Sequence, residues 1–199
     1  HTGTGRFSFL LMRPMTLFES LESTGEISLK DLFDSKNVNG VNKLSLEDIA
    51  YLCCRGGWPR SISMDKDIAL DQAFDYYDAV VNSDISRVDG INRESARVKT
   101  LMRSYARNIG TQVSIETLKK DMINNDSFSL DTDTVYSYIN ALKKIFVIEE
   151  VPAWNPNLRS KSAIRTSDTR YFVDPSIATA SLGLGPDDLI NDLNTFGFV

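Results

Sequence analysis

Histidine and cysteine are nearly absent from this sequence. Its 199 residues include one histidine, His1, and two cysteines, the neighbours Cys53 and Cys54. A single histidine at the start of the chain supplies almost no material for a Ser-His-Asp triad or for histidine-based metal binding. Two adjacent cysteines with one terminal histidine do not make a tetrahedral zinc site. A disulfide between neighbouring cysteines would be strained, so the pattern fits a reduced, cytosolic setting.

Long apolar runs and an excess of positive charge are also missing. No stretch approaches the roughly 20 apolar residues that a membrane-spanning helix needs, and residues 1–5 lack the layout of a secretory signal. We therefore expect a cytoplasmic protein without a membrane partner. The net charge of -5 opposes wholesale attraction to nucleic acid, so any site for a polyanion must be local. An apolar content of 42% is enough to bury a core.

Apolar spacing and capping residues predict a mainly helical α+β chain. Ser45 with Asp48 opens one helix in the manner of a capping box, and Gly56 closes it. The predicted helices cover 29–33, 45–56, 65–88, a stretch from 92 or 95 to 110, a short piece after 114, 131–146, 174–182 and 186–193. Two short strands are predicted, VIEEV at 147–151 and RYFV at 170–173.

The apolar run at the start of the chain predicts a further strand. Residues 6–17, RFSFLLMRPMTL, suit a buried strand that ends at Arg13-Pro14. Nothing nearby in the sequence supplies a sheet for it. Trp58 and Trp154 each lie close to a proline at the end of a segment, where we expect them to anchor loops to the core.

Three helices followed by a two-stranded ribbon form a winged-helix layout, here over 93–174. In the helix 131–146, a stripe of Val135, Ile139, Leu142 and Phe146 is expected to face the core. The outward face would carry Asp133, Ser137, Asn140 and Lys144. Acidic residues near the start of this helix repel the phosphates that flank a DNA groove, so we expect the helix to pack rather than to read DNA.

The more basic surface lies elsewhere. Lys99, Arg103 and Arg107 occupy positions i, i+4 and i+8 of the helix that ends at Gly110. The loop between the two strands could add Arg159, Lys161 and Arg165. Three to six phosphate contacts would give strongly salt-dependent binding of nucleic acid, and a protein partner is the other reading. A solvated helix face and a solvated loop would look the same in sequence.

Five stretches in this order resemble one family: GRFSFLLMRPMTLFES, GGWPR, SYARNIG, TVYSYINALKKIFVIEEVPAW and TRYFVDPSIATASLG. They are similar to bacterial and archaeal AAA+-type ATPases that carry a C-terminal domain of unknown function. The resemblance implies the end of an NTPase core and a connector at 1–40, a helical lid-like region at 41–92, the winged-helix domain at 93–174 and the start of a C-terminal helical segment at 175–199. It also implies that Arg6 senses the nucleotide.

The sequence departs from that family where ATP would bind. A phosphate-binding loop needs G-x-x-x-x-G-K-[ST], and neither this string nor a Walker B acid is present. We therefore expect no catalysis, no metal and no cofactor in this chain alone. ATP and Mg²⁺ would be bound by a P-loop core upstream, and the chain would be a fragment of a longer protein.

The expected function is that of a noncatalytic module, which couples the nucleotide state of an upstream P-loop ATPase core to a protein partner or to DNA. A freestanding winged-helix DNA-binding regulator is the alternative. A pure protein-interaction adaptor is the third class, and it would show neither ATPase coupling nor DNA affinity.

Overall fold

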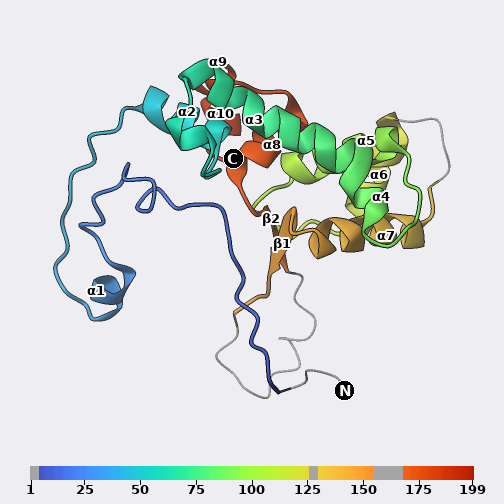
Figure 1. The fold of residues 1–199 in the computed structure, drawn as a ribbon, viewed down its shortest axis with the longest axis horizontal. Coiled ribbons are helices and arrows are strands. Elements are labelled where there is room, and N and C mark those ends of the chain that lie inside the picture. Colours follow the sequence, from blue (N-terminus) through green and yellow to red (C-terminus); the bar gives the residue numbers. More distant parts are fainter. Residues whose placement is uncertain (1–4, 126–129, 155–167) are drawn as a thin grey trace.

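The computed structural model describes residues 5–125, 130–154 and 168–199, and this part of the chain is mainly helical with one small antiparallel sheet. Figure 1 shows the elements in order. The helices are α1 (Leu29–Phe33), α2 (Leu46–Arg55), α3 (Lys66–Ala79), α4 (Ile85–Arg87), α5 (Ser95–Arg107), α6 (Ile115–Asn125), α7 (Thr132–Lys144), α8 (Pro175–Leu182), α9 (Pro186–Asn191) and α10 (Leu193–Phe196), with a 3-10 turn at Ser61–Ser63. The strands are β1 (Ile148–Val151) and β2 (Thr169–Phe172). The prediction of a mainly helical α+β chain is confirmed.

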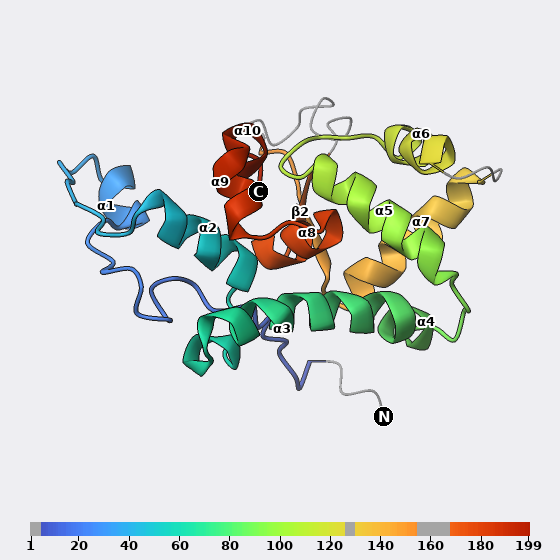
Figure 2. The same ribbon diagram turned by 90° about the horizontal axis from the view of Figure 1, so that it is seen from above.

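One long rod runs along the body, built from α3, a π-helical turn at Val80–Asp84 and α4. The rod lies along one side of the molecule in Figure 2. The spacing in the sequence predicts one apolar stripe along this rod, made of Leu70, Phe74, Tyr77, Val81, Ile85 and Val88. The prediction holds only for the second half of the rod, where Val81 and Ile85 are buried. In the first half Ala69 and Ala73 face the core instead, and Phe74 is 38% exposed. The π-helical turn changes the phase of the helix, so one regular spacing cannot describe both halves.

Helix α8 lies at the centre of the body. All its residues from Ser176 to Ser181 are buried, and it packs against α2, α3 and α5 (Figure 2). Asp174 caps its N-terminus, Pro175 occupies its first turn and Gly183 ends it in the left-handed conformation, as helix-terminus rules favour. Its small residues, among them Ala178 and Ala180, let three helices approach it closely.

Helices α5, α6 and α7 precede the two-stranded ribbon in chain order. β1 pairs antiparallel with β2, with Ile148 opposite Phe172. The ring of Phe172 meets Tyr105 of α5 edge-on at 5.2 Å between centroids, which joins the ribbon to the helices. The main core combines buried side chains of the rod, α5, α6, α7, the ribbon and α8, while Ala50, Cys54 and Leu189 form a second cluster between α2 and α9.

The outcome for the predicted stripe of α7 is mixed. Val135, Ile139 and Leu142 are buried as predicted, but Phe146 is 61% exposed. The reason is that α7 ends at Lys144, and Phe146 then takes a φ of 57°, outside the helical periodicity. On the outward face, Ser137 accepts a hydrogen bond from the buried Arg93, which fastens the loop before α5 to α7.

Candidate functional site

A buried hydrogen-bond junction brings together stretches that are far apart in the sequence. The carboxylate of Asp174, which is 3% exposed, accepts from the backbone N–H of Gly57 at 2.8 Å and from the backbone N–H of Ser176 at 2.9 Å. The Ser176 hydroxyl also donates to Asp174, at 2.6 Å, and accepts from the indole N–H of Trp58 at 2.9 Å. The Gly56-Gly57-Trp58 turn is thereby attached to the start of α8.

The same turn holds the N-terminal segment. The backbone N–H of Met15 donates to the carbonyl oxygen of Gly57 at 2.7 Å. A Cβ atom at Gly57 would lie 2.2 Å from the carbonyl oxygen of Met15, closer than any Cβ can approach, so this contact requires glycine. Arg13 donates to Glu149 of β1, with 3.2 Å between its Nε and a carboxylate oxygen. Residues 13–15 are therefore fixed to both the ribbon and the helical body.

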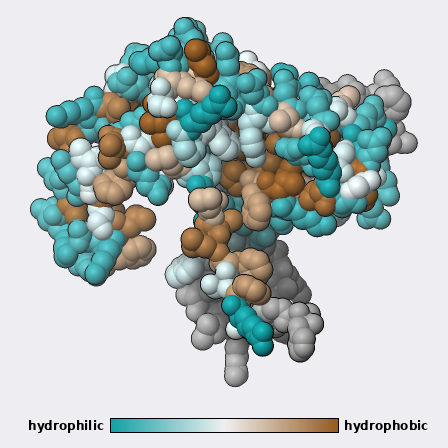
Figure 3. All heavy atoms as spheres, in the orientation of Figure 1, coloured by the Kyte–Doolittle hydropathy of each residue, from teal (hydrophilic) through white to brown (hydrophobic). Residues whose placement is uncertain are grey.

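Residues 6–12, which we call the arm, extend away from this attachment and cover little of their apolar surface. Phe7 is 76% exposed, Phe9 101%, Leu10 95%, Leu11 50% and Met12 89%. Figure 1 shows the arm in dark blue leaving the body, and Figure 3 shows apolar residues in brown on the part of the molecule that projects below the body. Within the described residues, no backbone hydrogen bond joins 6–12 to another segment. The buried strand predicted for 6–17 is therefore wrong for this structure, since no strand forms there and no sheet covers it.

An apolar groove of about 550 Å³ lies where the arm meets the body. Leu11 and Met12 line it from the arm, and Trp58, Tyr76 and Phe146 line it from the body. The rings of Trp58 and Tyr76 are in contact, tilted by 36° with 4.5 Å between their centroids, so Trp58 anchors its loop as predicted. Trp154, by contrast, is 87% exposed, and the same prediction is wrong for it because the chain after β1 leaves the body before it.

The predicted basic residues of α5 come together in a second cleft, of about 580 Å³. Lys99, Arg103 and Arg107 line it with Tyr77 of the rod and Ser181 of α8. Carboxylates lie near two of the three cations at long distances: the Nζ of Lys99 is 3.7 Å from Asp78, and an Nη of Arg107 is 3.9 Å from Asp121. Within the described residues, Arg103 has no ion pair. The cleft is locally positive although the chain is acidic.

The other predicted site residues are not gathered here. Arg6 is exposed at the outer end of the arm. Arg159, Lys161 and Arg165 lie outside the residues that the structure describes.

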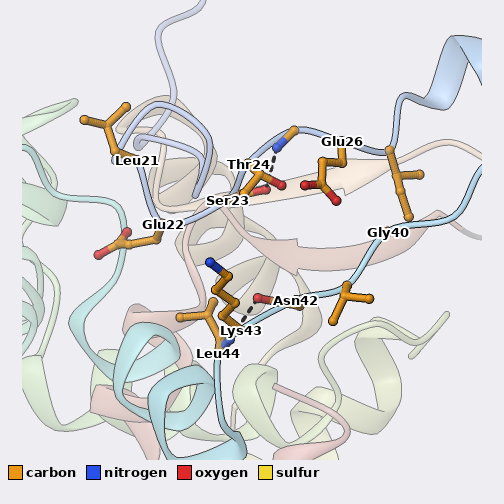
Figure 4. A pocket seen from close by; sticks show the side chains of 12 residues that line it. Leu21, Glu22, Ser23, Thr24, Glu26, Gly40, Asn42, Lys43 and Leu44 are labelled. Atoms are coloured by element: carbon orange, nitrogen blue, oxygen red, sulfur yellow. Dashed lines mark hydrogen bonds between the residues drawn. The ribbon is translucent and has the colours of Figure 1, made fainter.

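A third pocket, of about 420 Å³, lies between two stretches of the connector before α2. Figure 4 shows its lining, in which residues 21–27 face 40–44 across an open space. Among its charged groups, Glu22 is paired with the buried Arg55, which holds the pKa of that carboxyl below its usual value. Glu26 and Lys43 also line it, without an aligned nucleophile and base.

Reactive groups are equally scarce elsewhere. The described part of the chain contains no group of three or more histidine, cysteine, aspartate or glutamate side chains that could hold a metal ion. Burial raises the pKa of the Cys54 thiol to about 12, and it also raises that of Cys53. Both thiols are therefore poor nucleophiles at neutral pH.

The sequence from α2 to α9 matches one family model. The model described as "Domain of unknown function (DUF8612)" covers residues 46–188, well over half of the 199 residues. This chain belongs to the DUF8612 family. No curated protein and no solved structure matches it. The matched range contains the Gly57–Asp174 junction and the basic cleft of this DUF8612 member, whereas the arm lies before it.

The sequence motifs contain several important residues of this DUF8612 member, but they do not predict that these residues meet. The sequence places Gly57 and Asp174 at helix ends and Ser176 only within a motif, because spacing along the chain carries no information on contacts more than a hundred residues apart. Arg170 was missed as well: it is 8% exposed, pairs with Glu150 and donates to the carbonyl of Val113 at 2.9 Å. The alternation of β2 would have indicated its inward side.

No described helix has the length and apolar content to span a membrane.

Proposed function

We propose that this chain is the noncatalytic lid and winged-helix part of an AAA+-type ATP-binding protein. It docks on a P-loop ATPase core through the arm and passes the nucleotide state of that core to a partner. The observation that carries the proposal is the arm itself, an extended apolar segment that is exposed along its length and fastened at its base. Such a segment has a large amount of surface to bury and unpaired backbone groups to satisfy.

The pattern of the arm indicates the kind of surface that would receive it. Five of its six residues from Phe7 to Met12 are apolar, so both faces of an extended strand would be apolar. Antiparallel strands with one wet face alternate in polarity, whereas strands of parallel sheets, covered by helices on both sides, are apolar throughout. Phosphate-binding loops are built on strand–loop–helix units of such α/β proteins. A P-loop core therefore matches the arm in architecture, and it supplies the ATP and Mg²⁺ site that this sequence lacks.

The attachment of the arm provides a route for coupling. Met15 is bound to Gly57, Gly57 is bound to Asp174, and Asp174 caps α8. Helix α8 in turn packs against α2, α3 and α5. A shift of a docked arm would therefore reach the middle of the helical body through short, buried contacts. Arg6, at the outer end of the arm, would lie nearest the core, where a guanidinium can sense a terminal phosphate.

In this proposal α5, α6, α7 and the β1–β2 ribbon form the winged-helix domain, which faces the partner. Three helices followed by an antiparallel ribbon support this reading. The exposed Asp133 and Asn140 of α7 do not favour reading of a DNA groove by that helix.

A freestanding winged-helix DNA-binding regulator is the second candidate, because three basic side chains of α5 share one cleft. A regulator needs to bind one duplex sequence roughly a thousand-fold or more tighter than others. Selection from a pool of random duplexes that returns no preferred sequence would remove this candidate.

The docking proposal is tested by titrating the chain into a separately purified P-loop core, encoded ahead of it in the parent reading frame. We expect ATP turnover by the core to rise and then saturate. Burying a phenylalanine contributes about 1.5–3 kcal/mol. Phe9→Lys should therefore raise the chain concentration needed for half-saturation roughly 10-fold to 150-fold. Phe198→Lys is the matched control, because Phe198 is also exposed, at 66%, but belongs to the other end of the chain. Unchanged turnover at saturating chain would refute the coupling, and equal effects of the two variants would refute the role of the arm.

A further inference from the structure

We propose that the cleft along α5 binds the sugar–phosphate backbone of a nucleic-acid strand, with Lys99, Arg103 and Arg107 contacting successive phosphates. This site is distinct from the docking arm and does not depend on it. The arm residues do not line the cleft, and binding there is measured with this chain alone.

The spacing of the three cations favours a strand over a single small anion. Positions four apart on a helix are separated by about 6 Å along the axis, so the three side chains span about 12 Å. A repeating backbone with one phosphate per nucleotide offers charges at comparable intervals. A lone phosphate would engage one of these side chains, or two at most. All three residues lie on the exposed face of α5, so their stems are free to follow a strand.

The neighbours of the cations leave them available. Ion pairs of 3.7 Å for Lys99 and 3.9 Å for Arg107 are at the long end of the range, and both cations are half-exposed, so these pairs are weak. The Asp121 oxygen that lies 3.9 Å from Arg107 also accepts a hydrogen bond from the hydroxyl of the buried Ser104, at 3.0 Å. Arg103 lies between the two along α5, and Tyr77, a half-buried ring of the rod, lines the same cleft. The cleft therefore offers a bound nucleotide three cationic side chains that can donate hydrogen bonds to phosphate and one aromatic ring on which a base can stack.

The net charge of the chain sets the expected strength. With -5 overall, attraction must come from these three contacts, so binding should be modest and very sensitive to salt. Three phosphate contacts give a slope of log K against log salt of about -2.1 for a single strand and about -2.7 for a duplex. Affinity should fall roughly 20-fold to 40-fold between about 50 and 200 mM salt.

The test is fluorescence anisotropy of this chain with a labelled single strand of about a dozen nucleotides and with the duplex of the same sequence. We expect binding at low salt with the salt dependence given above. Whichever of the two binds tighter, single strand or duplex, is the kind of nucleic acid that the cleft takes. Arg103→Ala should reduce the slope by about 0.7–0.9. Lys30→Ala removes the same charge from α1, which lies apart from the body in Figure 1, and should change nothing.

A second variant separates binding from a structural role. Asp78→Asn removes the carboxylate beside Lys99. The change should strengthen binding several-fold, because it releases the Lys99 cation and removes a negative charge that repels the phosphates. Loss of a structural ion pair would not produce a gain. The proposal is overturned if neither nucleic acid binds at low salt. It is also overturned if Arg103→Ala leaves the slope unchanged or has the same effect as Lys30→Ala.

Discussion

Replacing Asp174 by asparagine tests the buried junction, because the change substitutes an amide NH₂ group for one carboxylate oxygen and leaves the size of the side chain almost unchanged. Asp174 receives three donors: the backbone N–H groups of Gly57 and Ser176 and the hydroxyl of Ser176. Two of them meet one carboxylate oxygen, and the N–H of Gly57 meets the other. An asparagine can keep its carbonyl oxygen toward Ser176, as helix N-caps commonly do. Its amide nitrogen then faces the N–H of Gly57, so two donors oppose each other.

The magnitude follows from the burial of this contact. A hydrogen bond to a charged group contributes about 1.5–3 kcal/mol, and a buried donor left without a partner costs about 1–3 kcal/mol. Asp174 is 3% exposed, so water cannot replace the lost acceptor. We expect Asp174→Asn to lower the free energy of unfolding by about 2–4 kcal/mol. For a chain of this length that corresponds to a fall in melting temperature of roughly 5–15 °C.

Asp192→Asn is the matched control. Asp192 caps α10 and accepts from the backbone N–H groups of Asn194 and Thr195 at 3.2 and 3.1 Å, and from the Thr195 hydroxyl at 2.6 Å. It is exposed, so solvent can satisfy any group that the amide leaves unpaired. Since asparagine is as good an N-cap as aspartate, the control should cost less than about 1 kcal/mol.

Urea unfolding followed by far-UV circular dichroism measures both variants, with equal slopes required for a valid comparison. Limited proteolysis provides a second readout: Gly57 also holds Met15, so cleavage in residues 6–15 should become faster in Asp174→Asn and stay unchanged in Asp192→Asn. The reasoning fails if both variants unfold at the same urea concentration as the unaltered chain, or if the exposed cap proves as costly as the buried one.

Two further predictions concern Asp89 and Phe146. The hydrogen bonds from Arg93 lower the pKa of Asp89 to about 2 from its ordinary 3.8, so the pair stabilises the folded state above about pH 4 and this stabilisation is lost as the pH falls toward 2. Urea unfolding between pH 5 and pH 2 should therefore show a smaller decline in Asp89→Asn than in the unaltered chain, and parallel curves would contradict this. Phe146 has a φ of 57° directly after α7 and is largely exposed, so Phe146→Gly should raise the unfolding free energy by up to about 1 kcal/mol. A loss of more than about 1 kcal/mol in the same assay would mean that packing of the ring outweighs the backbone strain.

Local signals in the sequence located most helices of this chain. The Ser45 cap with Asp48, the Gly56 stop and the Asp174-Pro175 start all appear in the structure as read, because capping depends on residues within one turn. Apolar spacing also predicts inward positions for Leu101 and Met102 of α5 and for Leu118 and Met122 of α6, and all four side chains are buried. For these two helices the spacing was a sufficient guide to burial.

Features that depend on contacts between distant segments were not predictable in the same way. The phase change in the rod comes from a π-helical turn that has no simple sequence signal, so regular spacing predicts an inward Phe74, whereas this side chain is 38% exposed. Arg93 is buried because Asp89, Ile85 and Ser137 all accept from it, and these partners come from two helices and a loop. The basic face of α5 was predicted from spacing, but its meeting with Tyr77 and Ser181 in one cleft required the packing of three helices.

The buried position of α8 affects the order in which this molecule can be completed during synthesis. Helices α2, α3 and α5 all turn a face toward α8, yet α8 is encoded after them, at residues 175–182. As the chain leaves the ribosome from its N-terminus, the faces of α2, α3 and α5 that pack on α8 have no counterpart until residues 175–182 have emerged. Until then these faces stay open to solvent or to a chaperone. The interior of the helical body is complete only when this one short helix has entered the space between the three others.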